Sequence, residues 1–349
     1  MATVLGTAAG TVGTSAAPPI LDVRSLTTTI PTARGTLTVV DDVSFAVAQG
    51  ECFGLVGESG SGKSMTLRSI LGLIPPPGRV ASGEVRHAGR DLVRLSQREL
   101  NRIRGREIAM IVQDAVSALN PVYRIGRQIG EPMLEHRIVK GARSARARAV
   151  ALMAKVGIPA PEKRVDDFPH QFSGGMCQRV VIATALACDP GLLLADEPTT
   201  ALDVTIQDQI LKLLVALQRD LGLSLLLVTH DMGVVAQTCQ RVAVMYAGQI
   251  VELVRTDALF RQPRHPYTAG LLNCVPRLDG PAVRLKPIPG APPDLAAPPS
   301  GCRFHPRCPL ATEACRSQRP ELVEVAPGHF SRCIRHHEMP PDLWKRLDA

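Results

Sequence analysis

The chain has 349 residues, 45% hydrophobic and 21% charged, which is ordinary globular composition and excludes disordered and fibrous proteins. This length predicts one large domain with an appendage, or two domains. The formal charge of +8 comes mostly from scattered arginines, which favours a solvated basic surface over a concentrated patch for nucleic acid or membrane.

The N-terminal residues 1–18 are mostly Ala, Gly and Thr without a basic residue, so we expect a flexible tail and no secretory signal. Apolar stretches such as Leu221–Val228 are far shorter than the roughly 20 residues that a membrane-spanning helix needs. Both features place the chain in the cytoplasm, where nine cysteines argue against disulfides.

Residues 20–56 read as short strands separated by polar turns, and the last apolar run, Cys52–Val56, is typical of a buried strand. A helix is expected from Met65 to Ile74, where three prolines end it. Between strand and helix stand eight residues that satisfy the phosphate-loop pattern: Gly57, Glu58, Ser59, Gly60, Ser61, Gly62, Lys63 and Ser64.

Glycines allow the backbone N–H groups of such a loop to converge on phosphate oxygens at a helix N-terminus. We expect Lys63 to reach the β and γ phosphates of ATP, and Ser64 to place its hydroxyl on Mg²⁺. The predicted ATP site comprises this loop, Met65 and the acidic residue Asp196 described next.

Helical spacing marks residues 91–103 and 139–156, and two apolar runs, 191–195 and 223–228, resemble buried parallel strands flanking a helix over 206–221. This alternation predicts an α/β sheet covered by helices. The first apolar run ends at Asp196, suited to Mg²⁺, and Glu197, suited to polarise the attacking water as a general base. Taken alone, two adjacent carboxylates could equally be a helix N-cap pair.

The segment Phe172–Met176 lies between the phosphate loop and the acidic strand and resembles the signature motif of ABC-transporter ATPases. In isolation Ser-Gly-Gly usually caps a helix. The resemblance implies an α/β P-loop NTPase of ABC type with an N-terminal antiparallel β subdomain, a helical subdomain over about 114–185 and an ATPase domain over 19–262. It also implies a dimer in which three residues contact the ATP of the opposite subunit: Ser173, Gly174 and Gly175.

Other positions match this family one by one. Gln113 resembles the glutamine that senses Mg²⁺ and water, Asp203 lies in a segment that resembles the loop crossing the dimer interface, and His230 resembles the switch histidine that contacts the γ-phosphate. The resemblance therefore makes Glu197, His230 and Gln113 catalytic, and Ser64, Gln113 and Asp196 the Mg²⁺ site.

The chain departs from the family at two places. No aromatic residue is available to stack on adenine, because the expected region offers only Ile30 or Arg34. Cys177 occupies a position that is usually basic, so we expect weaker contacts to phosphate without loss of activity.

Beyond Arg261 the sequence becomes rich in Pro and Cys. The segment Arg264–Thr268, followed by Leu271 and Leu272, resembles the C-terminal extension of oligopeptide/dipeptide importer ATPases, here 263–349. This implies an ATP-hydrolysing motor for peptide uptake, at the cytoplasmic face of the membrane, with a second ATPase subunit, commonly a paralogue, two membrane permease subunits and an extracytoplasmic solute-binding protein. Nickel or another small solute stays open as cargo, and a soluble ABC ATPase acting on ribosomes or nucleic acid is a further alternative.

Four cysteines lie close together in this extension: Cys302, Cys308, Cys315 and Cys333. Their spacing is not that of common zinc ribbons, so the residues leave zinc, an iron–sulfur cluster and unligated thiols open. Some members of the dipeptide importer family with this cysteine arrangement bind a 4Fe-4S cluster, and the resemblance implies the same cofactor here.

Overall fold

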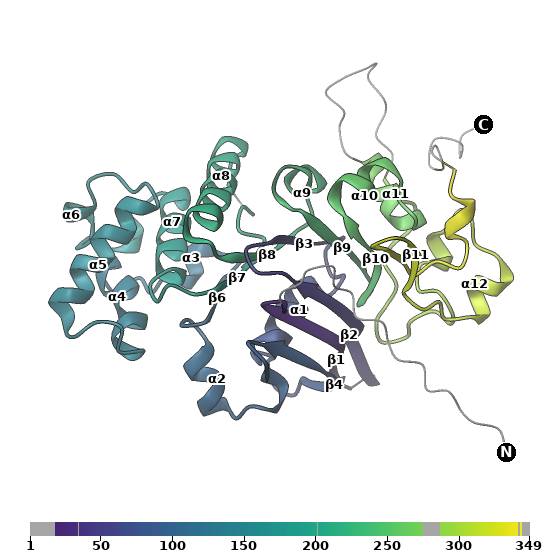
Figure 1. The fold of residues 1–349 in the computed structure, drawn as a ribbon, viewed down its shortest axis with the longest axis horizontal. Coiled ribbons are helices and arrows are strands. Elements are labelled where there is room, and N and C mark those ends of the chain that lie inside the picture. Colours follow the sequence, from purple (N-terminus) through teal and green to yellow (C-terminus); the bar gives the residue numbers. More distant parts are fainter. Residues whose placement is uncertain (1–17, 34, 201, 275–286, 341–342, 344–349) are drawn as a thin grey trace.

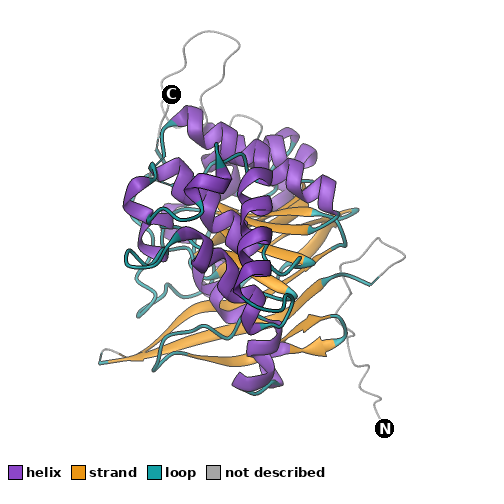
Figure 2. Cartoon of the chain, turned by 90° about the vertical axis from the view of Figure 1, so that its left-hand side faces the viewer, coloured by secondary structure: helices purple, strands orange, loops and turns teal. Residues whose placement is uncertain are grey.

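The computed structural model describes residues 18–33, 35–200, 202–274, 287–340 and 343. Nearly all of the predicted tail, as well as Arg34 and Ala201, therefore lies outside the described residues. One mixed sheet runs through the molecule, with a helical lobe at its left end, an antiparallel sheet below it and the C-terminal extension at its right end (Figure 1). Figure 2, seen from the left, shows the helical lobe in front of these strands.

The central sheet has the strand order β11-β12-β10-β9-β3-β8-β7-β6, and β6, β7, β8, β3 and β9 are parallel. The predicted apolar strands lie at its centre, and every residue of β3, β7 and β8 is buried, because helices cover one face of the sheet and α1 with the antiparallel sheet covers the other. The strands are β3 Cys52–Val56, β6 Ile108–Ile111, β7 Leu192–Asp196, β8 Ser224–Thr229, β9 Arg241–Tyr246, β10 Gln249–Arg255, β11 Val323–Ala326 and β12 His329–Ser331.

Successive residues of β7 face two different cores. Leu192 and Leu194 pack with α1 and the antiparallel sheet, whereas Leu193 and Ala195 pack with the helices on the opposite face. The helices around the sheet are α1 Lys63–Ile70, α2 Gln97–Ile103, α8 Val204–Leu221, α9 Met232–Thr238, α10 Thr256–Arg261 and α11 Pro266–Asn273.

The antiparallel sheet has the order β2-β1-β4-β5 and packs through α1 against the central sheet (Figure 1). Phe45 of this sheet stacks on Phe53 of β3 at a centroid distance of 5.2 Å, which ties the two sheets together. Its strands are β1 Leu21–Thr32, β2 Gly35–Val47, β4 Arg79–His87 and β5 Arg90–Asp91, followed by a 3-10 turn at Leu92–Arg94.

The helical lobe is formed by the middle of the chain, as the sequence predicts. Gly130 allows two of its helices to approach closely, because a Cβ there would lie 3.1 Å from Cβ of Ala145. Its helices are α3 Ala115–Ala118, α4 Ile125–Glu135, α5 Ala142–Lys155, α6 Pro161–Arg164 and α7 Gly174–Ala185, with a 3-10 turn at Pro169–Gln171.

Three predicted helices are shorter in the structure, among them α5, which covers only Ala142–Lys155 of the expected 139–156. Helix α1 ends at Ile70 rather than Ile74, because Gly72 takes a left-handed conformation with φ of 62° and closes the C-terminus. Helix α2 begins only after Ser96, which forms a capping box with Glu99, and the preceding residues form β5 and the 3-10 turn.

The C-terminal extension continues the ATPase sheet. Strand β12 pairs with β10 through Leu253 and Phe330, and β11 pairs with β12. The extension also contains α12 Glu313–Ser317 and 3-10 turns at His305–Arg307 and His336–Glu338.

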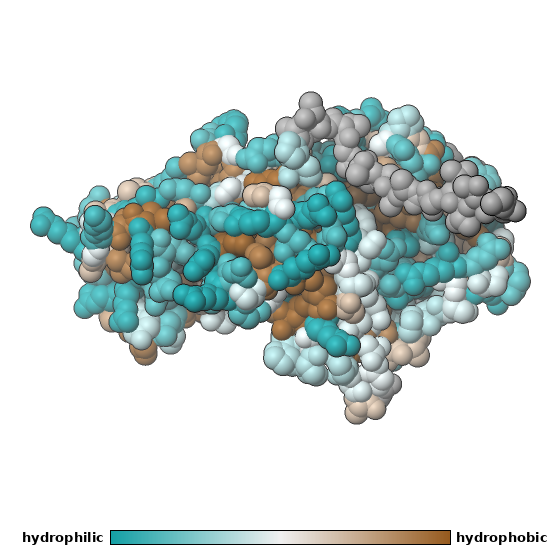
Figure 3. Space-filling view, turned by 60° about the horizontal axis from the view of Figure 1, so that its bottom comes forward, coloured by the Kyte–Doolittle hydropathy of each residue, from teal (hydrophilic) through white to brown (hydrophobic). Residues whose placement is uncertain are grey.

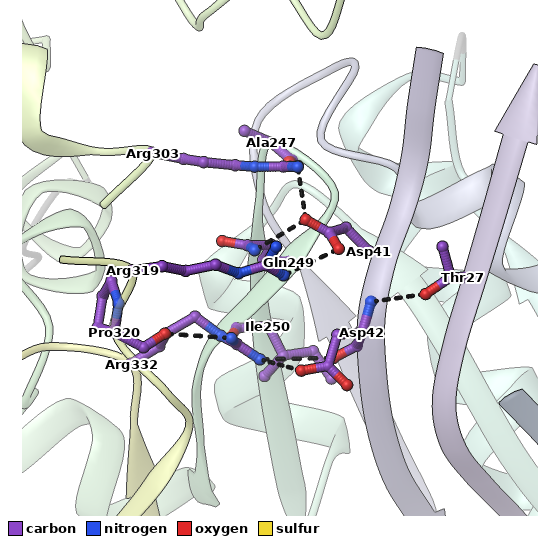
Figure 4. A network of polar contacts seen from close by, with 10 residues as sticks. All are labelled: Thr27, Asp41, Asp42, Ala247, Gln249, Ile250, Arg303, Arg319, Pro320 and Arg332. Atoms are coloured by element: carbon purple, nitrogen blue, oxygen red, sulfur yellow. Dashed lines mark hydrogen bonds and ion pairs between the residues drawn. The ribbon is translucent and has the colours of Figure 1, made fainter. Parts of the chain in front are cut away.

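Arginines of the extension also hold two carboxylates of β2 (Figure 4). Asp41 makes ion pairs of 2.5 Å with Arg303 and 2.9 Å with Arg319. Arg332 is buried, donates to the carbonyl of Ile250 at 3.0 Å and lies 3.4 Å from the carboxylate of Asp42. The extension is thereby fixed to both sheets.

No helix in the described part of the chain is long and apolar enough to cross a membrane. On the face drawn in Figure 3, apolar patches near the middle are surrounded by polar side chains and do not form a continuous band.

Candidate nucleotide site

The phosphate loop joins β3 to α1 and is shaped by glycines. Gly57 has a φ of 156°, and a Cβ there would lie 2.1 Å from the carbonyl oxygen of Met245. At Gly62, with φ of 106°, a Cβ would lie 2.5 Å from the carbonyl oxygen of Val39. Only glycine allows this close approach of backbones, which leaves the loop curled at the helix N-terminus.

Lys63 is held inside this loop, with its side chain 4% exposed. Its Nζ donates to the carbonyl oxygens of Gly57 at 2.8 Å and Glu58 at 2.9 Å, and lies 3.7 Å from Glu197 Oε1. Burial lowers the pKa of Lys63, while the neighbouring carboxylates oppose that shift. A cation is therefore positioned where the loop would receive phosphate.

Ser64 and Asp196 meet at the edge of the same loop. Ser64 Oγ donates to Asp196 Oδ1 at 2.8 Å, and Asp196 is 3% exposed. Burial raises the pKa of Asp196, and the hydrogen bond from Ser64 partly offsets this. A hydroxyl and a carboxylate beside a phosphate site are oxygen donors of the kind that Mg²⁺ prefers, so these residues fit the predicted ion.

Glu197 lies at the centre of a group of polar side chains from three segments. Its Oε2 accepts from Gln113 Nε2 at 3.2 Å and from Thr200 Oγ1 at 3.0 Å, and lies 3.2 Å from Nδ1 of His230. The residue has a φ of 43°, and its N–H donates to the carbonyl of Val228, which turns the side chain off the end of β7. The structure thus brings together the three residues predicted to be catalytic.

Thr200 was missed by the sequence analysis. It follows Glu197 by three residues, the spacing at which its N–H also donates to the carbonyl of Glu197. A threonine in a turn directly after the acidic strand was the available signal.

A cavity of about 570 Å³ opens over these residues. Its apolar wall contains Val39 of β2, Leu271 of α11 and Leu295, none of which the sequence analysis assigned to the site. Ile30 packs instead with the core beneath the antiparallel sheet, and Arg34 is outside the described residues. The cavity is lined by Val39, Gly57, Glu58, Ser59, Gly60, Gly62, Lys63, Ser64, Met65, Gln113, Glu197, His230, Leu271 and Leu295.

The predicted trans contacts lie away from this cavity. Ser173 and Gly174 are exposed at the start of α7, where Ser173 Oγ accepts from the N–H of Met176 at 3.3 Å. Asp203 is exposed at the start of α8 and caps it by accepting from Ile206 at 2.9 Å.

The two helix starts are adjacent, since a Cβ on Gly174 would lie 3.6 Å from Leu202 and one on Gly175 2.7 Å from Ile206. Cys177 is buried, and its thiol lies 3.7 Å from the carbonyl oxygen of Pro169. Its side chain therefore points into the helical lobe.

The prediction of an iron–sulfur cluster is wrong. Among the residues that the structure describes, no three His, Cys, Asp or Glu side chains are grouped so that they could hold a metal ion. The cavity beside the four cysteines has about 20 Å³, room for about one water. Burial also raises the pKa of both Cys308 and Cys333 to about 12.

A phosphate loop, an acidic strand and a Ser-Gly-Gly helix start, on a mixed sheet with a helical lobe, define an ATPase of the ABC type. Residues 40–200 match the ABC transporter family, and residues 251–315 match the oligopeptide/dipeptide transporter C-terminal region. The chain belongs to the ABC transporter family, in the group of ATP-binding proteins that carry this C-terminal region.

The chain is 49% identical to the dipeptide transport ATP-binding protein DppD of Bacillus subtilis, over 90% of this chain and 94% of that protein. It is 48% identical to the oligopeptide transport ATP-binding protein OppD of the same organism, over 93% of this chain and 91% of that protein. Among solved structures, the ATP-binding cassette MJ0796, a dimer bound to ADP and Pi, matches with a TM-score of 0.61 and 28% identity, over 68% of this chain and 98% of that one.

Proposed function

We propose that the chain is the ATP-hydrolysing motor subunit of an importer that takes up dipeptides or oligopeptides. The observation that carries this proposal is the position of Glu197, which contacts Gln113 and His230 at the edge of the phosphate-loop cavity. The names of relatives such as DppD and OppD support peptides as the cargo. The C-terminal region that the chain shares with this group supports it as well.

In the proposed reaction the loop binds the phosphates through its N–H groups and Lys63. Ser64, Asp196 and Gln113 would hold Mg²⁺, which when bound draws negative charge from the β and γ phosphates. Glu197 accepts a proton from the attacking water at its carboxylate, while Gln113 orients that water. His230 lies on the same carboxylate oxygen and is placed to donate to the γ-phosphate as charge builds on it.

We propose that a second ATPase subunit completes each site. Ser173, Gly174 and Gly175 lie at the exposed N-terminus of the 12-residue helix α7, where backbone N–H groups and the helix dipole favour an anion. Asp203 starts the neighbouring helix on the same surface. In a head-to-tail pair this surface would cover the phosphate loop of the partner ATPase. That partner is a paralogue of this chain or a second copy of it.

The permease subunits are proposed to dock beside Gln113. Val112 is 38% exposed, Val116 60% and Val122 71%, so three exposed apolar side chains lie within ten residues of Gln113 in the sequence. A membrane partner seated there would sense the position of Gln113 and hold the chain at the cytoplasmic face of the membrane, with a solute-binding protein delivering the peptide on the other side. We divide the chain into an ATPase domain over 19–262, with its helical subdomain over about 114–185, and the extension over 263–349.

The test is transport by the assembled complex. The chain, its partner ATPase and two permease subunits would be reconstituted in liposomes with the binding protein, and uptake of labelled dipeptides and oligopeptides measured with ATP inside. We expect ATP-dependent peptide uptake that Lys63→Ala abolishes. Uptake of nickel or another solute in place of peptides would overturn the cargo, and ATPase activity stimulated by RNA without permeases would overturn the transport role.

A further inference from the structure

The C-terminal extension contacts the phosphate loop through a buried arginine. Arg307, with its side chain 5% exposed, forms two hydrogen bonds with the carboxylate of Glu58: Nη1 to Oε2 at 2.7 Å and Nη2 to Oε1 at 3.0 Å. This bidentate geometry is the strongest form of an arginine–carboxylate pair. The two residues are 249 positions apart in the sequence, so the contact is purely tertiary.

A second contact from the extension reaches the same loop residue. The N–H of Glu58 donates to the hydroxyl oxygen of Tyr267 at 2.8 Å. Tyr267 is fully buried at the start of α11, where it follows His265 and Pro266. The ring of His265 accepts a hydrogen bond from the N–H of Tyr267. The His-Pro-Tyr segment, which the catalytic scheme does not use, therefore places one hydroxyl on the backbone of the phosphate loop.

An aromatic cluster fixes both contacting residues. The rings of Tyr246, Tyr267 and Phe304 have centroids 4.6 to 5.4 Å apart. The guanidinium of Arg307 lies 5.7 Å from the Tyr246 ring and donates to the carbonyl of Pro289 at 2.9 Å. Burial opposes the charge of Arg307, but its hydrogen bonds with Glu58 and Tyr246 outweigh burial and raise its pKa, so it stays protonated.

Glu58 needs this partner because of where it lies. It lines the nucleotide cavity, so an uncompensated carboxylate there would repel the negatively charged phosphates of ATP. Leu271 and Leu295 of the extension line the same cavity. The extension therefore supplies part of the cavity wall and the charge that neutralises an acidic loop residue.

We propose that the C-terminal extension is part of the nucleotide site and contributes two positioning residues. Arg307 neutralises the carboxylate of Glu58. Tyr267 fixes the backbone of Glu58 in the conformation that binds ATP. This inference rests on the proposed use of the phosphate loop for ATP. It gives the extension a direct effect on nucleotide affinity, in addition to its attachment through the arginines in Figure 4.

The test compares single and double substitutions in the full-length chain. A non-hydrolysable ATP analogue would be titrated with Mg²⁺ into wild type, Arg307→Met and Arg307→Met/Glu58→Gln, and KM and kcat for ATP measured on the assembled complex. We expect Arg307→Met to weaken binding on the order of tenfold, with KM rising more than kcat falls. The double variant should return to within about twofold of wild type, because removing the Glu58 charge removes the need for Arg307.

Rescue separates charge neutralisation from a purely structural role, because loss of the Arg307 contact with Pro289 would persist in the double variant. The matched control is Arg316→Met, an exposed arginine of the same extension whose ion pair is with Glu313. If Arg307→Met fails to fold, Arg307→Lys keeps the charge and should give an intermediate affinity. Tyr267→Phe keeps the packed ring and should weaken binding severalfold through the unpaired Glu58 N–H.

Analogue affinity that is unchanged in Arg307→Met, or that stays low in the double variant, would overturn the inference. Lys63→Ala, included in the same titration, tests the underlying function separately. Undiminished binding in that variant would overturn the phosphate-loop assignment itself, whatever Arg307 does.

Discussion

Ser64 Oγ donates a hydrogen bond to Asp196 Oδ1 across 2.8 Å, joining residues 132 positions apart in the sequence. The carboxylate is buried, and burial raises its pKa above the ordinary 3.8. A carboxylate with a raised pKa costs stability at any pH above that pKa, and the cost vanishes below pH 3.8, where folded and unfolded chains are both protonated. The Mg²⁺ site therefore weakens the nucleotide-free fold at neutral pH.

We expect Asp196→Asn to stabilise the nucleotide-free chain at pH 7 by on the order of 1 kcal/mol and to abolish Mg²⁺-dependent ATP hydrolysis. The amide oxygen can still accept from Ser64, so only the charge is lost. Urea unfolding at pH 7 and at lower pH checks this, since the difference from wild type should shrink as the pH falls. Asp208→Asn, an exposed carboxylate of α8, is the control, and a destabilised Asp196→Asn chain would contradict the account.

Because of His265, the free energy of unfolding of the chain should fall as the pH drops from neutral into mild acid. The residue is fully buried and its ring accepts from the N–H of Tyr267, and burial lowers its pKa to about 3. Below pH 6.5 the unfolded chain binds a proton that the folded chain rejects, so stability falls by about 1.4 kcal/mol per pH unit, or about 2 kcal/mol by pH 5. His265→Asn keeps the helix cap and should remove that part of the slope in urea unfolding, whereas exposed His170→Asn should not.

Two glycines offer a matched test of the loop geometry. Gly57 and Gly50 both have positive φ, but a Cβ at Gly57 would lie 2.1 Å from a backbone oxygen, whereas nothing lies within 4 Å at Gly50. Gly50→Ala should cost only about 1 kcal/mol of unfolding free energy, from its backbone conformation alone. Gly57→Ala should cost clearly more and lose ATP binding, and equal effects of the two substitutions would rule out the close approach.

The dimer surface predicts a defect that spares ATP binding by the single chain. Ser173→Arg places a large side chain at the exposed start of α7, away from the nucleotide cavity of the same chain. We expect this variant to lose its ATP-dependent association with the partner ATPase, as measured by size-exclusion chromatography. Nucleotide binding by the isolated chain should persist. Ser144→Arg, on an exposed position of α5, should leave association intact.

The sequence predicts best the parts that depend on local pattern. Strands β3, β7 and β8 each contain an uninterrupted apolar run, and the phosphate loop and Glu197 directly follow two of these strands. The end of α1 was less predictable, because the left-handed Gly72 ends the helix before the prolines do.

Contacts between distant segments could not be read from the sequence. The cavity wall combines Val39, Leu271 and Leu295 from three separate segments, and Arg307 reaches Glu58 only in the folded chain. The prediction of an iron–sulfur cluster was wrong for a related reason. Cysteines that are close in the sequence need not enclose enough space for a cluster, and the cavity beside these four has a volume of only about 20 Å³.

The central claim is that Glu197 activates water at a site that binds ATP independently of it. The most direct measurement is steady-state ATP hydrolysis by Glu197→Gln in the assembled complex, together with equilibrium ATP binding by the same variant. The amide keeps the size of the side chain but is a far weaker base, so we expect hydrolysis to fall at least 100-fold with ATP still bound and the ATPase pair held closed. Hydrolysis within a few fold of wild type would contradict the account.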